Sequence, residues 1–190
     1  MPPHDERLAG CDHGDAALDM VDIALCAAGE DGHRDCSRGR ACDDGPVMEG
    51  IEPSLVPELL VTDLDQSLEF WCGVCGFAVA YARPEERFAY IALGSAHLML
   101  EQVGVGRNWI TGPLERPLGR GVNLQITVPN TEALVQALGR RGVELFMQPE
   151  TKWYGVGEEE AGVHQFLVQD PDGYLVRFQS SLGRRPAVQS

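Results

Sequence analysis

The chain has 190 residues, 44% of them hydrophobic, which is enough for one or two domains with a buried core. Its formal net charge of −14 argues against a nucleic-acid partner, because an acidic surface repels phosphate groups. The sequence has no apolar stretch of the roughly 20 residues that a membrane-spanning helix needs, and its acidic start argues against a secretory signal. We therefore expect no membrane partner and a cytoplasmic location.

Residues 1–47 are expected to form a disordered acidic extension. They are rich in Asp, Gly and Cys, and outside residues 15–29, which favour a short helix, they show no helix or strand periodicity. Met48 follows this segment directly, so one hypothesis is that translation starts there. A native peptide from upstream of Met48 would contradict that hypothesis.

The six cysteines are unevenly placed along the chain. Four of them lie in the acidic extension: Cys11, Cys26, Cys36 and Cys42. Cys72 and Cys75 have the spacing of a metal-binding pair, but no second pair or histidine lies nearby in the sequence. We interpret these two as small core or helix-face residues, reduced as in other cytosolic proteins.

The same order of elements occurs twice from residue 54 onward. In the first copy, a strand at 56–64 reaches Thr62 and Asp63, either of which can cap a helix, and the helix that follows ends at Gly76. In the second copy, a strand at 121–130 ends in Asn130 and the helix ends at Gly142. Three strands are predicted after each helix, at 77–83, 88–94 and 97–102 in the first copy and at 143–148, 164–169 and 174–180 in the second.

The repeat predicts an α+β fold made of two βαβββ modules. Module one is expected at 54–103 and module two at 121–180, with a linker at 104–120 and a flexible tail at 183–190. One helix covers only one face of a four-stranded unit, so the other face must meet a partner or enclose a ligand. The two modules are therefore expected to form a curved mixed sheet with a concave cleft, a natural place for a small molecule.

Several segments resemble the vicinal oxygen chelate superfamily, which includes glyoxalases, extradiol dioxygenases and bleomycin resistance proteins. They are the opening PELLVTDLDQSLEFW, the GF after the first helix and the closing DPDGYLVRF, and the resemblance covers residues 54–182. It implies that the metal ligands of the superfamily's enzymes would fall at Val56, Met99, Asn123 and Arg177. An aliphatic group, a thioether, a neutral amide and a cation do not make a divalent-metal site, even with Glu101 two residues beyond Met99. No metal, other cofactor or catalytic residue is therefore expected.

The segments RPEERFAYIALGSAHLMLEQ and GRGVNLQITV resemble the bleomycin-resistance-like branch of this superfamily. That resemblance implies a homodimer that sequesters a bleomycin-type or other cationic or planar compound without transforming it, and an acidic surface suits such a ligand. Two alternatives remain open. One is an enzyme, either a metal-dependent lyase or dioxygenase with shifted ligands or one that uses His97 and Glu101 as acid and base. The other is a protein-interaction module.

Strand alternation predicts which side chains face the cleft. The predicted ligand-binding residues on strands are Glu58, Leu60, His97, Met99, Glu101, Asn123, Gln125, Thr127 and Arg177. Trp109, Trp153 and Tyr154 are expected on loops beside this face, where flat rings can stack on a planar ligand or a cation. The alternatives are a solvated sheet face and aromatic residues that fill a dimer interface.

Overall fold

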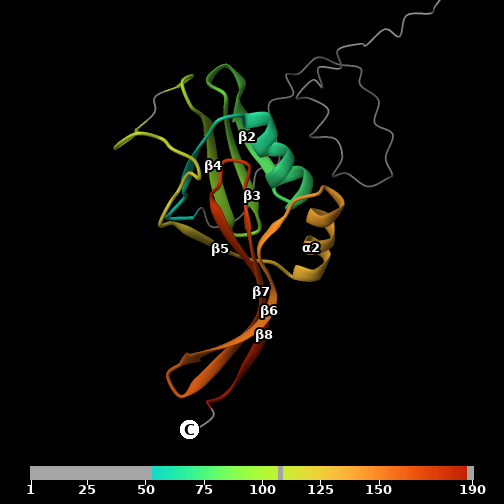
Figure 1. Cartoon of the computed structure of the whole chain (residues 1–190). Coiled ribbons are helices and arrows are strands. Elements are labelled where there is room, and N and C mark those ends of the chain that lie inside the picture. The colour runs from blue at the N-terminus through green and yellow to red at the C-terminus, as the bar shows by residue number, and fades with distance from the viewer. Residues whose placement is uncertain (1–52, 107–108, 188–190) are drawn as a thin grey trace, which may run out of the picture. The chain divides into compact units, whose positions relative to one another are not determined.

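The computed structural model describes residues 53–106 and 109–187. The chain divides into two units, residues 1–41 and 42–190, and all described residues belong to the second. The predictions on the acidic extension, its four cysteines and a start at Met48 lie outside the described residues. Within them, the α+β fold with two βαβββ modules is confirmed (Figure 1). Each module forms its own four-stranded mixed sheet.

The first sheet has the strand order β1-β4-β3-β2. β1 runs parallel to β4, and β3 pairs antiparallel with both β4 and β2. The elements of this module are β1 (Glu58–Val61), α1 (Leu64–Leu68), the π-helix η2 (Glu69–Val74), β2 (Ala78–Arg83), the 3₁₀-helix η3 (Pro84–Glu86), β3 (Phe88–Leu93) and β4 (Ala96–Gln102). Of the two predicted candidates, Thr62 and Asp63, it is Asp63 that caps α1, because its Oδ1 accepts the backbone N–H groups of Asp65 at 2.9 Å and Gln66 at 3.1 Å.

The second sheet repeats this arrangement in the order β5-β8-β7-β6. Its elements are β5 (Asn123–Thr127), α2 (Thr131–Arg140), β6 (Leu145–Val156), β7 (Glu159–Gln169) and β8 (Leu175–Pro186). Asn130 caps α2, since its Oδ1 accepts the N–H of Ala133 at 3.0 Å. The two copies of the repeat therefore use the same device to turn from a strand into a helix.

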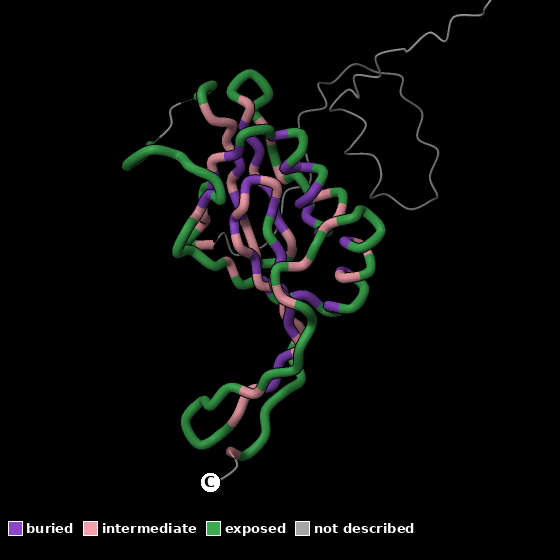
Figure 2. Tube along the Cα trace, viewed as in Figure 1, coloured by how far each residue is buried: buried purple, intermediate pink, exposed green. Residues whose placement is uncertain are grey.

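The last three strands are longer than the sequence predicted. β6 and β7 include most of residues 149–160, which were expected in a loop, and β8 includes residues 183–186, which were expected in a flexible tail. These ends extend from the rest of the second sheet as a three-stranded arm, residues 151–162 and 181–186 (Figure 1). Most of the arm is exposed (Figure 2).

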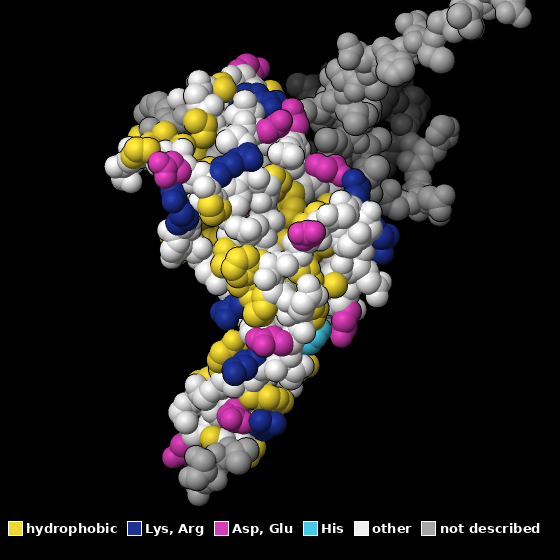
Figure 3. Space-filling model, viewed as in Figure 1, with side chains coloured by type: hydrophobic (Ala, Val, Ile, Leu, Met, Phe, Trp, Pro, Cys, Tyr) yellow, Lys and Arg dark blue, Asp and Glu magenta, His cyan; other side chains and the backbone are white. Residues whose placement is uncertain are grey.

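Ion pairs between neighbouring strands stabilise the arm, which has no buried hydrophobic face. Arg184 lies 3.0 Å from Glu159 and Arg185 lies 2.8 Å from Glu160, each joining β8 to β7. Figure 3 shows acidic, basic and hydrophobic side chains interspersed along the arm. Because neither face is buried, the arm lacks the alternation of hydrophobic and polar residues by which strands are found in a sequence.

The two modules share one hydrophobic core on the helix side of the sheets. Its largest fully buried side chains include Trp71 and Leu100 from module one and Phe166, Phe178 and Leu138 from module two. Cys75 lies in this core, Cys72 packs against it, and both are free thiols, as predicted. Burial raises the pKa of the Cys72 thiol to about 11, so this cysteine is a poor nucleophile.

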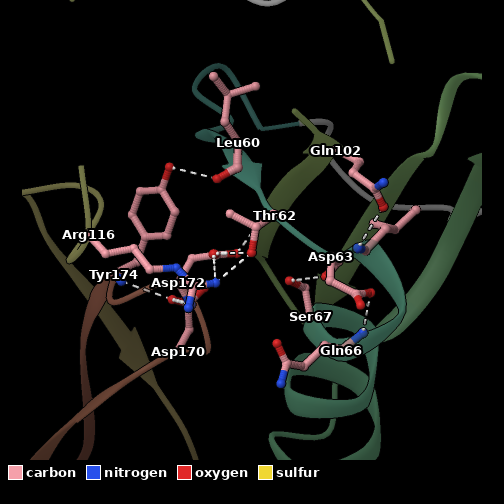
Figure 4. A network of polar contacts seen from close by, with 11 residues as sticks. Leu60, Thr62, Asp63, Gln66, Ser67, Gln102, Arg116, Asp170, Asp172 and Tyr174 are labelled. Carbon is pink, nitrogen blue, oxygen red and sulfur yellow. Dashed lines mark hydrogen bonds and ion pairs between the residues drawn. The ribbon is translucent and has the colours of Figure 1, made fainter. Parts of the chain in front are cut away.

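A polar cluster joins the modules at the turn between β7 and β8 (Figure 4). The carboxylate of Asp172, only 1% exposed, accepts the backbone N–H of Thr62 at 2.9 Å, the hydroxyl of Thr62 at 2.7 Å and the guanidinium of Arg116 at 2.7 Å. We call Thr62, Arg116 and Asp172 the clamp. Beside it, the hydroxyl of Tyr174 donates to the carbonyl oxygen of Leu60 at 3.1 Å. The end of β1 is therefore bonded to the last hairpin of the chain.

Asp170 in the same turn makes the stability of the protein depend on pH. Burial raises the pKa of its carboxyl to about 6, although the N–H groups of Tyr174 and Asp172 oppose the shift. The folded chain therefore holds a proton that the unfolded chain releases, so this contribution is complete below about pH 4 and is lost as the pH rises through about 6. Over this pH range, the free energy of unfolding of Asp170→Asn should fall by about 2 kcal/mol less than that of the unchanged protein, because the amide stays neutral.

Urea denaturation of both proteins at several pH values between about 4 and 7 measures this difference. The unfolding free energies should converge toward the acid end of the range. A constant difference across the range would contradict the assignment of the proton to Asp170.

Candidate functional site

A cavity of about 560 Å³ lies over the open face of the first sheet. β1 contributes Glu58 and β4 contributes Met99 and Glu101 to its floor. Trp109, from the segment that links the modules, lies at its border. All four were predicted to bind a ligand, and the structure brings them to one cavity.

The floor of the cavity holds a pair of carboxyl groups, Glu58 and Glu101. The parallel register aligns Glu58 with Met99 and Leu60 with Glu101, so the two glutamates lie on adjacent strands and on the same face. Burial first, and then the hydrogen bond and negative charge of Glu58, raise the pKa of Glu101 to about 7. A proton lies between the two groups when Glu101 is protonated, and the pair gains a negative charge as the pH passes 7.

Gly106 allows the backbone to approach this pair closely. A Cβ at this position would overlap Oε1 of Glu101, so any other residue would push the carboxylate away. The glycine therefore helps to hold Glu101 against the wall of the cavity, and it explains part of the burial of this carboxyl group.

Aromatic rings from β2 and β3 form the wall beside the acid pair. The ring of Tyr81 stacks on that of Tyr90 with centroids 5.0 Å apart, and it lies 6.0 Å from the ring of Phe88. The guanidinium carbon of Arg83 lies 3.7 Å above the centroid of the Phe88 ring. Tyr81, Arg83 and Phe88 line the cavity, so it combines negative charge with flat apolar surface.

These wall residues were not predicted, although the sequence contained a signal for them. Tyr81 and Arg83 in β2, and Phe88 and Tyr90 in β3, alternate with residues that face the helices. The same alternation that identified Glu58 and Glu101 therefore places them on the open face. Glu86, which also borders the cavity, lies in η3, where strand alternation does not apply.

Two further predicted residues of module one lie outside this cavity. Leu60, together with Trp109, borders a second cavity of about 350 Å³ formed by the linker. His97 lies on β4 and borders neither cavity. Its Nδ1 lies 2.9 Å from the hydroxyl of Tyr90 on the same face of the sheet, so it helps to fix the position of that ring.

The remaining predicted strand residues lie on the second sheet: Asn123, Gln125, Thr127 and Arg177. They border neither cavity, and Arg177 donates a hydrogen bond to the side-chain oxygen of Gln125. Within the chain they therefore lie on a different sheet from Glu58, His97 and Glu101, and their role in ligand binding stays a prediction. The two modules have separate sheets, so strand alternation defines two open faces rather than one.

Trp153 and Tyr154 lie on strand β6 in the arm, and their expected placement on a loop is wrong. The ring of Trp153 packs over Gly162, where a Cβ would collide with it, and the guanidinium of Arg185 lies 3.9 Å from the ring centroid. The hydroxyl of Tyr154 accepts a hydrogen bond from the amide of Gln165 at 2.9 Å. Neither residue borders the two cavities described here.

The residues at the four expected ligand positions do not fit a divalent metal ion. Val56 precedes β1, Asn123 begins β5 and Arg177 is bonded to Gln125. Met99 offers only a soft thioether beside the glutamate pair, and an arginine cation repels a metal. Among residues 53–106 and 109–187, no group of three or more His, Cys, Asp or Glu side chains is placed to hold a metal ion.

A family model of the glyoxalase/bleomycin resistance protein/dioxygenase superfamily matches residues 55–178. A member of this superfamily from Vibrio splendidus 12B01 is 39% identical over 67% of this chain and 97% of its own, with a TM-score of 0.31. No curated protein matches the chain. In the part of the chain that the structure describes, no helix is long and apolar enough to cross a membrane.

Two other solved structures are similar in fold. TioX from Micromonospora sp. ML1 is 21% identical over 68% of this chain and 100% of its own, with a TM-score of 0.52. An integron cassette protein from the mobile metagenome of V. cholerae is 16% identical over 68% of this chain and 97% of its own, also with a TM-score of 0.52. The family match and the repeated βαβββ modules agree: the chain belongs to the glyoxalase/bleomycin resistance protein/dioxygenase superfamily.

Proposed function

We propose that the protein binds a cationic, planar small molecule, such as a bleomycin-type compound, in the cavity of the first sheet and sequesters it without transforming it. The observation that carries this proposal is the Glu58–Glu101 pair beside the rings of Tyr81 and Phe88. Carboxylates attract the charge of such a ligand, and flat rings stack on its planar part. The net charge of −14 would speed the encounter with a cation.

The side chains on the floor of the cavity support ligand binding rather than metal-assisted catalysis. The expected metal positions carry an unsuitable donor set, and the cavity offers one acid pair with an aromatic wall. Of the described thiols, Cys75 is buried in the core and Cys72 packs against it, away from the residues that line the cavity.

The proposal includes a homodimer in the cytoplasm as the working state of the protein. The open face of each sheet and the exposed arm leave protein surface available to a second copy. Sedimentation velocity of the full chain tests the assembly, and a monomer at micromolar concentration would contradict it.

Calorimetric titration of the full chain with metal-free bleomycin tests the binding function. We expect one ligand per cavity and an affinity that weakens from low to moderate salt, because screening reduces the attraction between the ligand and the acidic protein. Intact ligand recovered after incubation would support sequestration. No heat of binding at high micromolar ligand at either salt concentration would refute the bleomycin assignment.

A further inference from the structure

The aromatic wall of the cavity already carries a positive charge, that of Arg83. Its guanidinium carbon lies 3.7 Å above the centre of the Phe88 ring, within the distance of a cation–π contact. Its Nε lies 2.6 Å from Oε2 of Glu86, a second residue that borders the cavity. Arg83 also acts electrostatically on Glu101, so the charge of one side chain acts on both the ring and this carboxyl group.

The place that Arg83 occupies is the one that a cationic ligand would need. A ring face accepts one cation at a time, and Phe88 is next to Glu101 in the register of β3 and β4. A ligand with its charge over Phe88 and beside Glu101 must therefore displace the guanidinium. The side chain of Arg83 is 47% exposed, so it has room to turn toward solvent and remain near Glu86.

We infer that Arg83 competes with the ligand. Its guanidinium occupies the cation position of the empty cavity, and only a cationic ligand binds tightly enough to displace it. This inference rests on the proposed function, because it names the group that decides which compounds enter the proposed site. A neutral planar compound gains no attraction from the acid pair to offset the loss of the contact between Arg83 and Phe88. Displacing Arg83 costs both kinds of ligand the same free energy, and only a cation regains it from the acid pair.

Calorimetric titration with phenyltrimethylammonium chloride tests the inference on the full chain, because this probe has a planar ring and a charge that does not depend on pH. We expect Arg83→Gln to bind the probe about tenfold more tightly than the unchanged protein, since the ring and the acid pair are then free. The neutral isostere tert-butylbenzene, followed by ligand-observed NMR, should also gain affinity in Arg83→Gln, because it no longer has to displace the guanidinium, but should stay the weaker ligand, because the acid pair does not attract it.

Arg184→Gln is the matched control, because it removes the same charge from an exposed ion pair on the arm, outside the cavity. An equal gain in Arg184→Gln would show that net charge alone is responsible and would overturn the inference. Unchanged or weaker binding in Arg83→Gln, with binding retained in the unchanged protein, would overturn the inference and leave the proposed function intact. Absence of binding in both would remove the inference and the proposed site together.

Discussion

Replacing Asp172 by alanine is expected to lower the free energy of unfolding by about 3 kcal/mol. The carboxylate of Asp172 is buried and accepts three hydrogen bonds, two from Thr62 and one from the charged Arg116. Without it, the N–H of Thr62 at the end of β1 loses its partner, and the two modules lose a direct polar connection. Urea denaturation at neutral pH measures the effect.

Asp65→Ala provides the control for the clamp. Asp65 also pairs with an arginine, Arg87 at 2.9 Å, but its side chain is 63% exposed, so the change should cost less than about 1 kcal/mol. Equal losses in the two variants would mean that burial of Asp172 does not matter. In that case the clamp would add little to the connection between the modules beyond an exposed ion pair.

The double substitution Glu58→Gln with Glu101→Gln is expected to weaken binding of phenyltrimethylammonium about 50-fold. Glutamines keep the shape of the cavity floor and remove its negative charge. Because the pKa of Glu101 is raised to about 7, the affinity should also depend on pH. In the unchanged protein the affinity for this cation should rise from about pH 6 to about pH 8, as the pair becomes ionised, and in the double variant it should not.

Glu159→Gln with Glu160→Gln is the matched control, because it makes the same change in net charge on the arm. We expect it to weaken binding less than about threefold at moderate salt, since charges beyond a Debye length are screened. A loss as large as that of the cavity variant would show that the probe responds to the charge of the whole protein. A pH dependence that survives in the cavity variant would assign the titration to another group.

The sequence was sufficient to predict the repeat, since each of its signals is local. Asp63 and Asn130 cap the two helices as predicted, and Gly76 and Gly142 have positive φ angles where the helices were expected to end. Strand alternation also placed Glu58 and Glu101 on one face, which the register of β1 and β4 confirms. Each of these inferences needs only residues that are close in the chain.

The relation between the modules could not be predicted in the same way. Gln125 and Arg177 obey the same alternation as Glu58 and Glu101, but whether the four share one sheet depends on contacts between distant segments. The arm was missed for a different reason. Its stability comes from pairs such as Arg184 with Glu159, and a strand without a buried face leaves no hydrophobic pattern.

The clamp also bears on how the chain folds during its synthesis. The partner that completes the end of β1, Asp172, lies 110 residues after Thr62, in the turn between β7 and β8. A ribosome releases the chain from its N-terminal end, so module one emerges long before this partner exists. The polar groups at the end of β1 therefore stay open to water until module two has been synthesised, and the two modules become one cooperative unit only after the turn between β7 and β8 has formed.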